Sequence, residues 1–184
     1  NMLRFKMGDA MFFQAIKNYL KVVNLAYKYA KTPDLQSHLE AVYGSSLAEF
    51  FNDWVYNQGY PSYSITAQNL GNGQAKFTIR QTQSDASVSF FEMPVPIRVF
   101  GTGGQQLDLV LNNTVNGESF TENVPFAITS VTFDPEKNII SKSNSINLNR
   151  KKFELTSSQL FLNPATQLLS LDIPSDIKID NVHF

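Results

Sequence analysis

The amino-acid sequence predicts an α+β protein whose helices and strands are segregated along the chain. Residues 1–60 carry apolar side chains at helical spacing, about three to four residues apart. After Pro61 the apolar residues alternate with polar ones, which is typical of strands that bury one face. Glycines and asparagines that favour turns separate these strands. Together these observations predict an N-terminal helical segment followed by an antiparallel β-sandwich.

The first 30 residues contain the start and stop signals of two helices. Residues 1–7 have the pattern of the last turns of a helix that ends at Gly8, so we expect the chain to be a piece of a longer polypeptide. Asp9 is the expected N-cap of a helix from Ala10 to about Tyr29. Its expected buried face consists of Phe12, Ile16, Tyr19, Leu20, Val23 and Tyr27.

Two further helices are expected before residue 60. The first is capped by Thr32 and ends at Gly44. The second begins at Ser46, and Glu49 three residues later completes a capping box. The packing face of this last helix is expected to consist of Leu47, Phe50, Phe51, Trp54 and Val55.

Strands are expected in about six to eight short segments between residues 61 and 141. Alternation puts Phe77 with Ile79, and Ile97 with Val99, on a common face. Leucines recur in the same way further along the chain, at Leu107, Leu109 and Leu111. Residues 142–159 are polar and without clear period, which predicts a linker, and residues 160–184 resume the alternation.

Composition excludes several classes of function. The net charge is −1 and the isoelectric point is about 6.1, so neither nucleic acid nor an anionic membrane is an expected partner. Because the sequence contains no cysteine, it forms no disulfide and uses no thiol chemistry.

The order and spacing of short motifs in residues 2–61 are more specific than any one motif. They are Met2-Leu3-Arg4, Gly8-Asp9, Asp34-Leu35, Leu39-Glu40, Phe50-Phe51, and Asp53-Trp54 followed by Gln58-Gly59-Tyr60-Pro61. This succession resembles the aminopeptidase N family of zinc metallopeptidases, in the segment that follows the zinc site. The resemblance implies that residues 1–60 end a thermolysin-like catalytic domain, and that residues 61–141 form the β-domain beside it.

The C-terminal residues resemble a different family. The motif Leu162-Asn163-Pro164-Ala165-Thr166 and the alternation after it are similar to the start of the C-terminal sorting domain of type IX secretion substrates. Residues 160–184 would then be a partial sorting domain. The resemblance implies a protein secreted by, or held on the surface of, a Gram-negative bacterium, with the outer-membrane secretion machinery as a partner.

No catalytic, cofactor-binding or metal-binding residue is predicted within this chain. The family's zinc ligands lie in a His-Glu-x-x-His motif with a later Glu, and the sequence contains no such motif. Its two histidines, His38 and His183, fall in different expected domains. His38 and Glu40 are two residues apart and therefore point to different faces of a helix. The resemblance thus implies zinc for the parent protein and none for this fragment.

Other candidate sites have simpler structural interpretations. Residues 101–104 predict a hairpin turn rather than a phosphate loop, and residues 150–152 a solvated basic run. Glu49 and Asp53 could form a carboxylate pair, but local capping is the preferred interpretation. An aromatic group could stack on sugars or peptides, although core and domain-junction packing is favoured: Phe50, Phe51, Trp54, Tyr56, Tyr60 and Tyr63.

The leading hypothesis is a non-catalytic C-terminal fragment of a secreted zinc aminopeptidase that removes N-terminal residues from peptides. Its helices would support the metal site, and its sandwich would flank the substrate cavity. The expected partners are the upstream catalytic domain and, through the parent, peptide substrates. The alternatives are a β-sandwich that binds carbohydrate or protein without peptidase activity, and a family member that has lost its zinc ligands. Apolar surface that promotes self-association is expected at Met2, Leu3, Phe5, Phe12 and Phe13.

Overall fold

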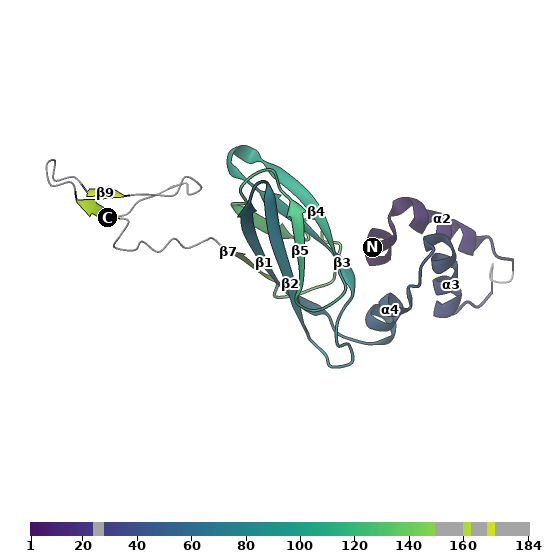
Figure 1. Ribbon diagram of the computed structural model, residues 1–184. Helices are drawn as coiled ribbons and strands as arrows, with labels where there is room; N and C mark the ends of the chain where they lie inside the picture. Colours follow the sequence, from purple (N-terminus) through teal and green to yellow (C-terminus); the bar gives the residue numbers. More distant parts are fainter. Residues whose placement is uncertain (24–27, 150–159, 163–168, 172–184) are drawn as a thin grey trace. The chain divides into compact units, whose positions relative to one another are not determined.

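The computed structural model describes residues 1–23, 28–149, 160–162 and 169–171. The chain divides into two units, Asn1–Arg150 and Lys151–Phe184. Helices come first in the larger unit, and strands follow them (Figure 1). In the smaller unit, β8 (Leu160–Leu162) pairs antiparallel with β9 (Leu169–Leu171). The predicted α+β class with segregated helices and sheets is therefore confirmed.

Short helices make up the first part of the larger unit. These are α1 (Met2–Met7), α2 (Asp9–Leu20), α3 (Thr32–Tyr43) and α4 (Ala48–Phe51). A π-helical turn, η1 (Asn52–Tyr56), continues α4. Helices α2 and α3 pack against each other, and Ala15 and Leu39 are fully buried.

The structure corrects both ends of the second helix. Gly8, with a φ of 81°, is the N-cap, and Asp9 is the first helical residue. The helix ends at Leu20 instead of continuing to about Tyr29. The side chains of Leu20 and Val23 are 67% and 81% exposed. Because no described residue covers this part of the apolar stripe, the stripe gains no burial there that would extend the helix. Tyr27 lies outside the described residues.

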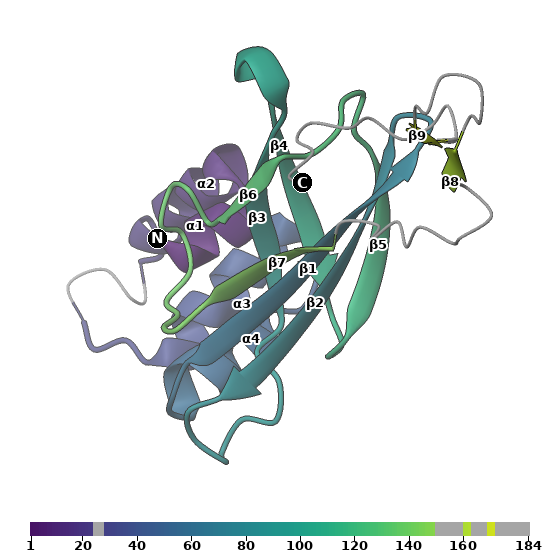
Figure 2. The ribbon, with the colours of Figure 1, turned by 90° about the vertical axis from the view of Figure 1, so that its left-hand side faces the viewer.

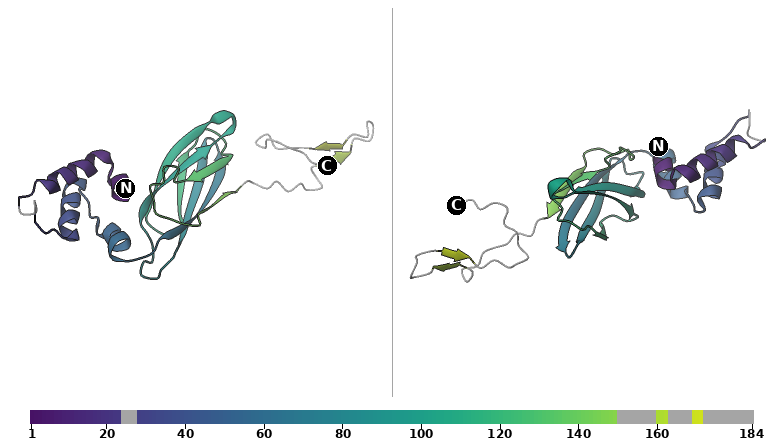
Figure 3. Two further views of the ribbon diagram at one scale, coloured as in Figure 1. Left: turned by 180° about the vertical axis from the view of Figure 1, so that it is seen from behind. Right: turned by 90° about the horizontal axis from the view of Figure 1, so that it is seen from above.

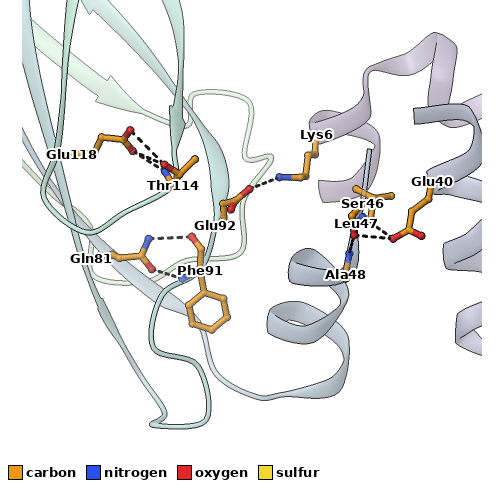
Figure 4. Close-up of polar contacts among 10 residues, drawn as sticks. All are labelled: Lys6, Glu40, Ser46, Leu47, Ala48, Gln81, Phe91, Glu92, Thr114 and Glu118. Carbon is orange, nitrogen blue, oxygen red and sulfur yellow. Dashed lines mark hydrogen bonds and ion pairs between the residues drawn. The ribbon is translucent and has the colours of Figure 1, made fainter. Parts of the chain in front are cut away.

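Two predicted caps are also replaced by other groups. Thr32 is the first residue of α3 rather than its N-cap, and the backbone N–H of Lys31 donates to the Asp34 carboxylate at 2.7 Å. At α4, the Glu40 carboxylate accepts the N–H of Leu47 at 2.7 Å. Glu49, the carboxylate predicted for that role, is exposed. The N–H of Leu47 is therefore capped from the preceding helix, at a separation that the capping-box pattern does not include, while the Ser46 hydroxyl accepts the N–H of Ala48 at 3.1 Å (Figure 4).

The strands of the larger unit form two sheets. One has the order β5-β2-β1-β7 and the other the order β4-β3-β6. Their bounds are Pro61–Gly71 for β1, Gln74–Gln83 for β2, Met93–Phe100 for β3, Gln106–Asn113 for β4, Glu118–Asn123 for β5, Ser130–Phe133 for β6 and Ser145–Asn149 for β7. All pairs are antiparallel except β1 with β7, which is parallel.

Strand β7 replaces residues 145–149 of the linker predicted over residues 142–159, and residues 150–159 lie outside the described residues. Ile146 lies opposite Ile65 and Leu148 opposite Ala67, so both continue the inner face of β1. Asn and Ser surround these two apolar residues in the sequence, which hid the alternation. The strand forms because β1 offers an edge with unpaired backbone groups.

The core lies between the two sheets. Its fully buried residues from the four-stranded sheet include Tyr63, Ile65, Phe77 and Ile79, and those from the three-stranded sheet include Val95, Ile97, Val99 and Leu111. They occupy alternate positions along their strands, as predicted, because successive side chains of a strand point to opposite faces.

Within this unit, the four-stranded sheet faces away from the helices. Figure 2 shows β1, β2 and β7 in front with the helices behind them, and Figure 3 shows the helices beside the sheets in both of its views. The helical part touches the segment that leads into β3, where Lys6 of α1 meets Glu92. The helical part thus contacts the sandwich on the side of β3, through the segment that precedes this strand.

The predicted apolar surface on the first helices is mostly covered. Met2 is buried, and Leu3, Phe5 and Phe12 are half-buried against the core. Phe13 alone of the predicted set is exposed, at 53%. Other large side chains of the helical part are exposed instead, at Met11, Leu20, Val23, Tyr29, Val55 and Tyr56.

Candidate functional site

The junction between the helical part and the sandwich brings together aromatic side chains from both. The rings of Trp54 in η1 and Phe91 lie 4.6 Å apart, and those of Phe50 and Trp54 lie 6.3 Å apart. Phe50, Phe51 and Phe91 are buried. The preferred interpretation of Phe50, Phe51 and Trp54 as packing at the domain junction is confirmed.

The other predicted aromatics do not join this cluster. Tyr63 lies inside the sandwich, where its ring is 4.9 Å from that of Phe133. Tyr56 is 56% exposed and Tyr60 is half-buried. The six aromatic residues are therefore divided between the junction, the sandwich interior and more exposed positions, and they form no continuous stacking platform for a sugar or a peptide.

A buried amide holds the sandwich side of the junction in position. Gln81, which is 2% exposed, accepts the N–H of Phe91 at its Oε1 (2.8 Å) and donates from its Nε2 to the Phe91 carbonyl (3.1 Å). Figure 4 shows this two-bond contact between β2 and the segment before β3. Sequence reasoning missed Gln81, although its inward position follows from the alternation of Phe77 and Ile79.

An ion pair links α1 to the same segment. The Nζ of Lys6 lies 3.2 Å from a carboxylate oxygen of Glu92, and their side chains are 12% and 36% exposed (Figure 4). The side chains of Asn1 and Asn138 form a second link between the two parts at 3.3 Å. Neither contact could be predicted, because both depend on how distant segments approach each other.

Asp53 carries the least favourable charge of the junction. Its side chain is 3% exposed and accepts a hydrogen bond from the Asn52 amide at 3.3 Å. Its second carboxylate oxygen, Oδ2, has no partner among the described residues. Burial raises the pKa of the Asp53 carboxyl, and the negative charges of Glu49 and Glu92 raise it further. Keeping the Asp53 carboxylate ionised in this buried position therefore reduces the free energy of unfolding.

His38 is held by its own helix. Its Nδ1 lies 2.7 Å from the Asp34 carbonyl, to which it donates, and its ring makes an edge-on contact of 5.4 Å with Tyr19. The neighbouring Glu40 accepts hydrogen bonds from Gln36 and from Leu47, which lower its pKa. His38 and Glu40 therefore serve different parts of α3, and neither points to a shared metal. His183 lies outside the described residues.

The glycine-rich segment 101–104 connects strands, as predicted. Its short helical turn, η2 (Thr102–Gly104), joins β3 to β4, and the N–H of Gly101 donates to the Gln105 carbonyl at 2.9 Å. A Cβ at Gly101 would lie 2.6 Å from the Phe126 ring, so close packing requires glycine here. No helix follows the turn to bind a phosphate. The basic run 150–152 lies outside the described residues.

No metal centre forms within the part of the chain that the structure describes. There, no three Asp, Glu or His side chains come together in a way that could hold an ion. The zinc set of two histidines and a carboxylate does not fit the described residues either, because His38 is the one histidine among them. Also among the described residues, no helix is long and apolar enough to cross a membrane.

The chain is similar to parts of two aminopeptidases. It is 29% identical over 80 residues to a leucyl aminopeptidase from Saccharolobus solfataricus, which covers 42% of this chain and 10% of that protein. It is 38% identical over 64 residues to aminopeptidase M1-C from Oryza sativa subsp. japonica, covering 35% of this chain and 7% of that protein. No protein-family model matches the chain.

These similarities show that the chain contains an aminopeptidase-related region. The matched segments span a small part of each relative, 10% and 7% of its length. The predicted relation to aminopeptidases is confirmed at this level.

Proposed function

We propose that this chain is a non-catalytic C-terminal part of a secreted zinc aminopeptidase that removes N-terminal residues from peptides. The observation that carries the proposal is the similarity to two aminopeptidases in a chain that runs from helices into a β-sandwich. In this role the helices would support a metal site formed by residues upstream of Asn1. The sandwich would flank the cavity that receives the peptide.

The contacts at the junction support these separate roles for the helices and the sandwich. The Lys6–Glu92 ion pair and the Trp54–Phe91 contact fix the helical part against the sandwich. A rigid connection of this kind would allow the sandwich to hold helices in place around a site that neither part contains.

The exposed apolar residues of α2 support an upstream partner. Met11, Phe13 and Leu20 are 39%, 53% and 67% exposed. We propose that the upstream catalytic domain covers them, because a helix that exposes several large apolar side chains is usually part of an interface.

An activity assay on two polypeptides tests the proposal. The chain from Asn1 to Phe184 should not hydrolyse leucine p-nitroanilide, and the polypeptide extended to the start of its reading frame should do so. A chelator should abolish that hydrolysis, and added zinc should restore it. Chelator-sensitive hydrolysis by the short chain would contradict the proposal. An inactive extended polypeptide without His-Glu-x-x-His would instead identify a relative that has lost its zinc ligands.

Secretion through the C-terminal residues is a separate proposal. Strand β9 (Leu169–Leu171) falls where alternation was predicted. We propose that residues 160–184 belong to a sorting domain read by an outer-membrane secretion machinery, which places the protein outside a Gram-negative cell. Deleting these residues in the native bacterium should leave the protein inside the cell, as measured by blotting of the culture medium. Unchanged export would contradict this.

A further inference from the structure

The outer face of the four-stranded sheet has an unusual composition. A shallow hollow of about 330 Å³ lies over it. We call this the polar face and define it by the residues that line the hollow from three adjacent strands: Thr66, Gln68, Lys76, Thr78, Arg80 and Ser119. Every side chain in this set is a hydroxyl, an amide or a cation.

Strand register places these groups in regular rows. Thr66 of β1 lies opposite Thr78 of β2, which in turn lies opposite Ser119 of β5. The Thr78 and Ser119 hydroxyl oxygens are 2.8 Å apart. In the next row, Gln68 lies opposite Lys76. The inner residues between these positions are buried in the core, so the polar face is fixed by a rigid sheet.

The charges of the two cations of the polar face are not paired within the described part of the chain. Among the described residues, neither Lys76 nor Arg80 forms an ion pair. Arg98 of the other sheet, by contrast, is paired with Asp108 at 2.6 Å and with Glu136 at 3.4 Å. Lys76 and Arg80 are four residues apart on one strand, which separates them by ~13 Å along the face.

Gly117 lies beside one of the cations. A Cβ at this position would lie 3.8 Å from the Nε of Arg80, and its φ of +81° disfavours any other residue. The Arg80 side chain therefore lies beside bare backbone. The helices of this unit are behind the other sheet and do not cover the face (Figure 2).

We propose that the polar face binds an anionic polysaccharide, a sugar chain that bears carboxylate or sulfate groups. The cations Lys76 and Arg80 would each attract one anionic group. The hydroxyls and amides between them would exchange hydrogen bonds with sugar hydroxyls. This binding goes beyond the proposed peptidase role and does not depend on it.

Two other ligand classes fit the polar face less well. A neutral sugar would be expected to stack on an aromatic side chain, and the polar face contains none. A peptide would need an apolar pocket for an anchoring side chain, and the polar face contains no apolar side chain.

Fluorescence anisotropy with labelled probes tests the proposal on the full chain. The probes are a polygalacturonate oligosaccharide, a heparin oligosaccharide, maltoheptaose and polyglutamate, in buffer of about 50 mM ionic strength. At least one of the two anionic sugars should bind, and added salt should weaken the binding. The arm that responds identifies carboxylate or sulfate as the recognised group.

Paired charge variants provide the matched control. Lys76→Gln/Arg80→Gln should weaken binding by about fivefold to tenfold. Lys17→Gln/Lys21→Gln removes the same charge from exposed positions of the helical part and should change affinity by less than about twofold. All four positions are exposed, and circular dichroism verifies that each variant is folded.

Several results would overturn the inference. Equal binding of maltoheptaose would show that charge does not contribute to recognition. Equal binding of polyglutamate would indicate that the polar face binds an acidic protein instead. Unchanged affinity in Lys76→Gln/Arg80→Gln, or no binding of either anionic sugar, would exclude the polar face as the site. Each of these leaves the aminopeptidase proposal intact, because the peptidase assay does not use these residues.

Discussion

The sandwich and the helical part bury their apolar side chains to different extents. The strands enclose a core in which Tyr63, Ile65, Phe77 and Ile79 are no more than 1% exposed. In the helical part, by contrast, Leu20, Val23 and Phe13 are more than half exposed. Since burial of apolar area is the main source of stability, the sandwich supplies most of it within this chain.

This difference in burial indicates how far each part depends on the other for its stability. The sandwich closes its core with its own residues, whereas the helical part depends on the sandwich at one side and exposes apolar residues elsewhere. The junction is therefore where a change in one part reaches the other. Substitutions in the core, at the junction and on the helix surface should have effects in that order.

The largest loss of stability is expected for Phe77→Ala in the sandwich core. Phe77 is fully buried, and truncating a buried phenylalanine costs about 3–5 kcal/mol of unfolding free energy. Guanidinium unfolding followed by circular dichroism measures the change. Phe13→Ala on α2, where the side chain is 53% exposed, is the matched control and should change stability by less than about 0.5 kcal/mol.

The milder variant Phe77→Leu keeps this test informative if Phe77→Ala does not fold. It should destabilise by about 1 kcal/mol because part of the side-chain volume remains. Equal effects at positions 77 and 13 would contradict the contrast between the two parts.

The next largest effect is expected for Gln81→Ala at the junction. The substitution leaves both the N–H and the carbonyl of Phe91 buried without their partner, at a cost of about 2 kcal/mol. Because Phe91 packs on Trp54, the tryptophan fluorescence of the folded protein should shift as well. Gln74→Ala, at an exposed position of the same strand, should do neither. A loss of stability without a change in tryptophan fluorescence would mean that Gln81 stabilises the sandwich but does not position Phe91 against Trp54.

Regular alternation made most of the sandwich predictable, whereas the weakly apolar strand β7 was missed. Phe77 and Ile79 mark their strand because every second residue is apolar and the core needs them. Strand β7 contains two apolar residues among asparagines and serines, and it becomes a strand through its pairing with β1. Long-range pairing of this kind leaves no local signal.

The helical part was predicted less well because its ends depend on packing. The apolar stripe after Leu20 continues in the sequence, but no partner covers it and the helix stops. The cap of α4 was assigned to Glu49, yet Glu40 supplies it from the preceding helix. At the junction, the inward position of Gln81 could be read from the strand period, whereas the Lys6–Glu92 pair could not.

A smaller effect, of opposite sign, is expected for Asp53→Asn. Burial raises the folded-state pKa of Asp53 above its unfolded value. The stability that this group contributes is therefore fully present below the unfolded pKa and is lost as pH rises through the folded pKa. The neutral amide should remove that loss and stabilise the protein by about 1 kcal/mol at pH 7.

The advantage of Asp53→Asn should shrink as pH falls toward the unfolded pKa of about 3.9. Thermal unfolding between about pH 4 and pH 8 measures this difference. Glu49→Gln, at an exposed position one helical turn away, should show a much weaker pH dependence. If Asp53→Asn destabilised the protein at neutral pH, a partner group would have to stabilise the charged form of the buried carboxylate.

The smallest effect is expected for the ion pair that joins the two parts. A double-mutant cycle with Lys6→Met and Glu92→Gln should give a coupling free energy of about 0.5–1 kcal/mol, because the pair is partly buried. The same cycle on Arg4 and Asp9, whose side chains are 45% and 66% exposed within the helical part, should give a smaller coupling despite the shorter distance of 2.7 Å. Added salt should reduce the second coupling more than the first, because solvent screens exposed charges better. If the Arg4–Asp9 coupling were the larger of the two, contact distance rather than burial would determine the coupling free energy. The Lys6–Glu92 pair would then not be a stronger link than an ordinary surface ion pair.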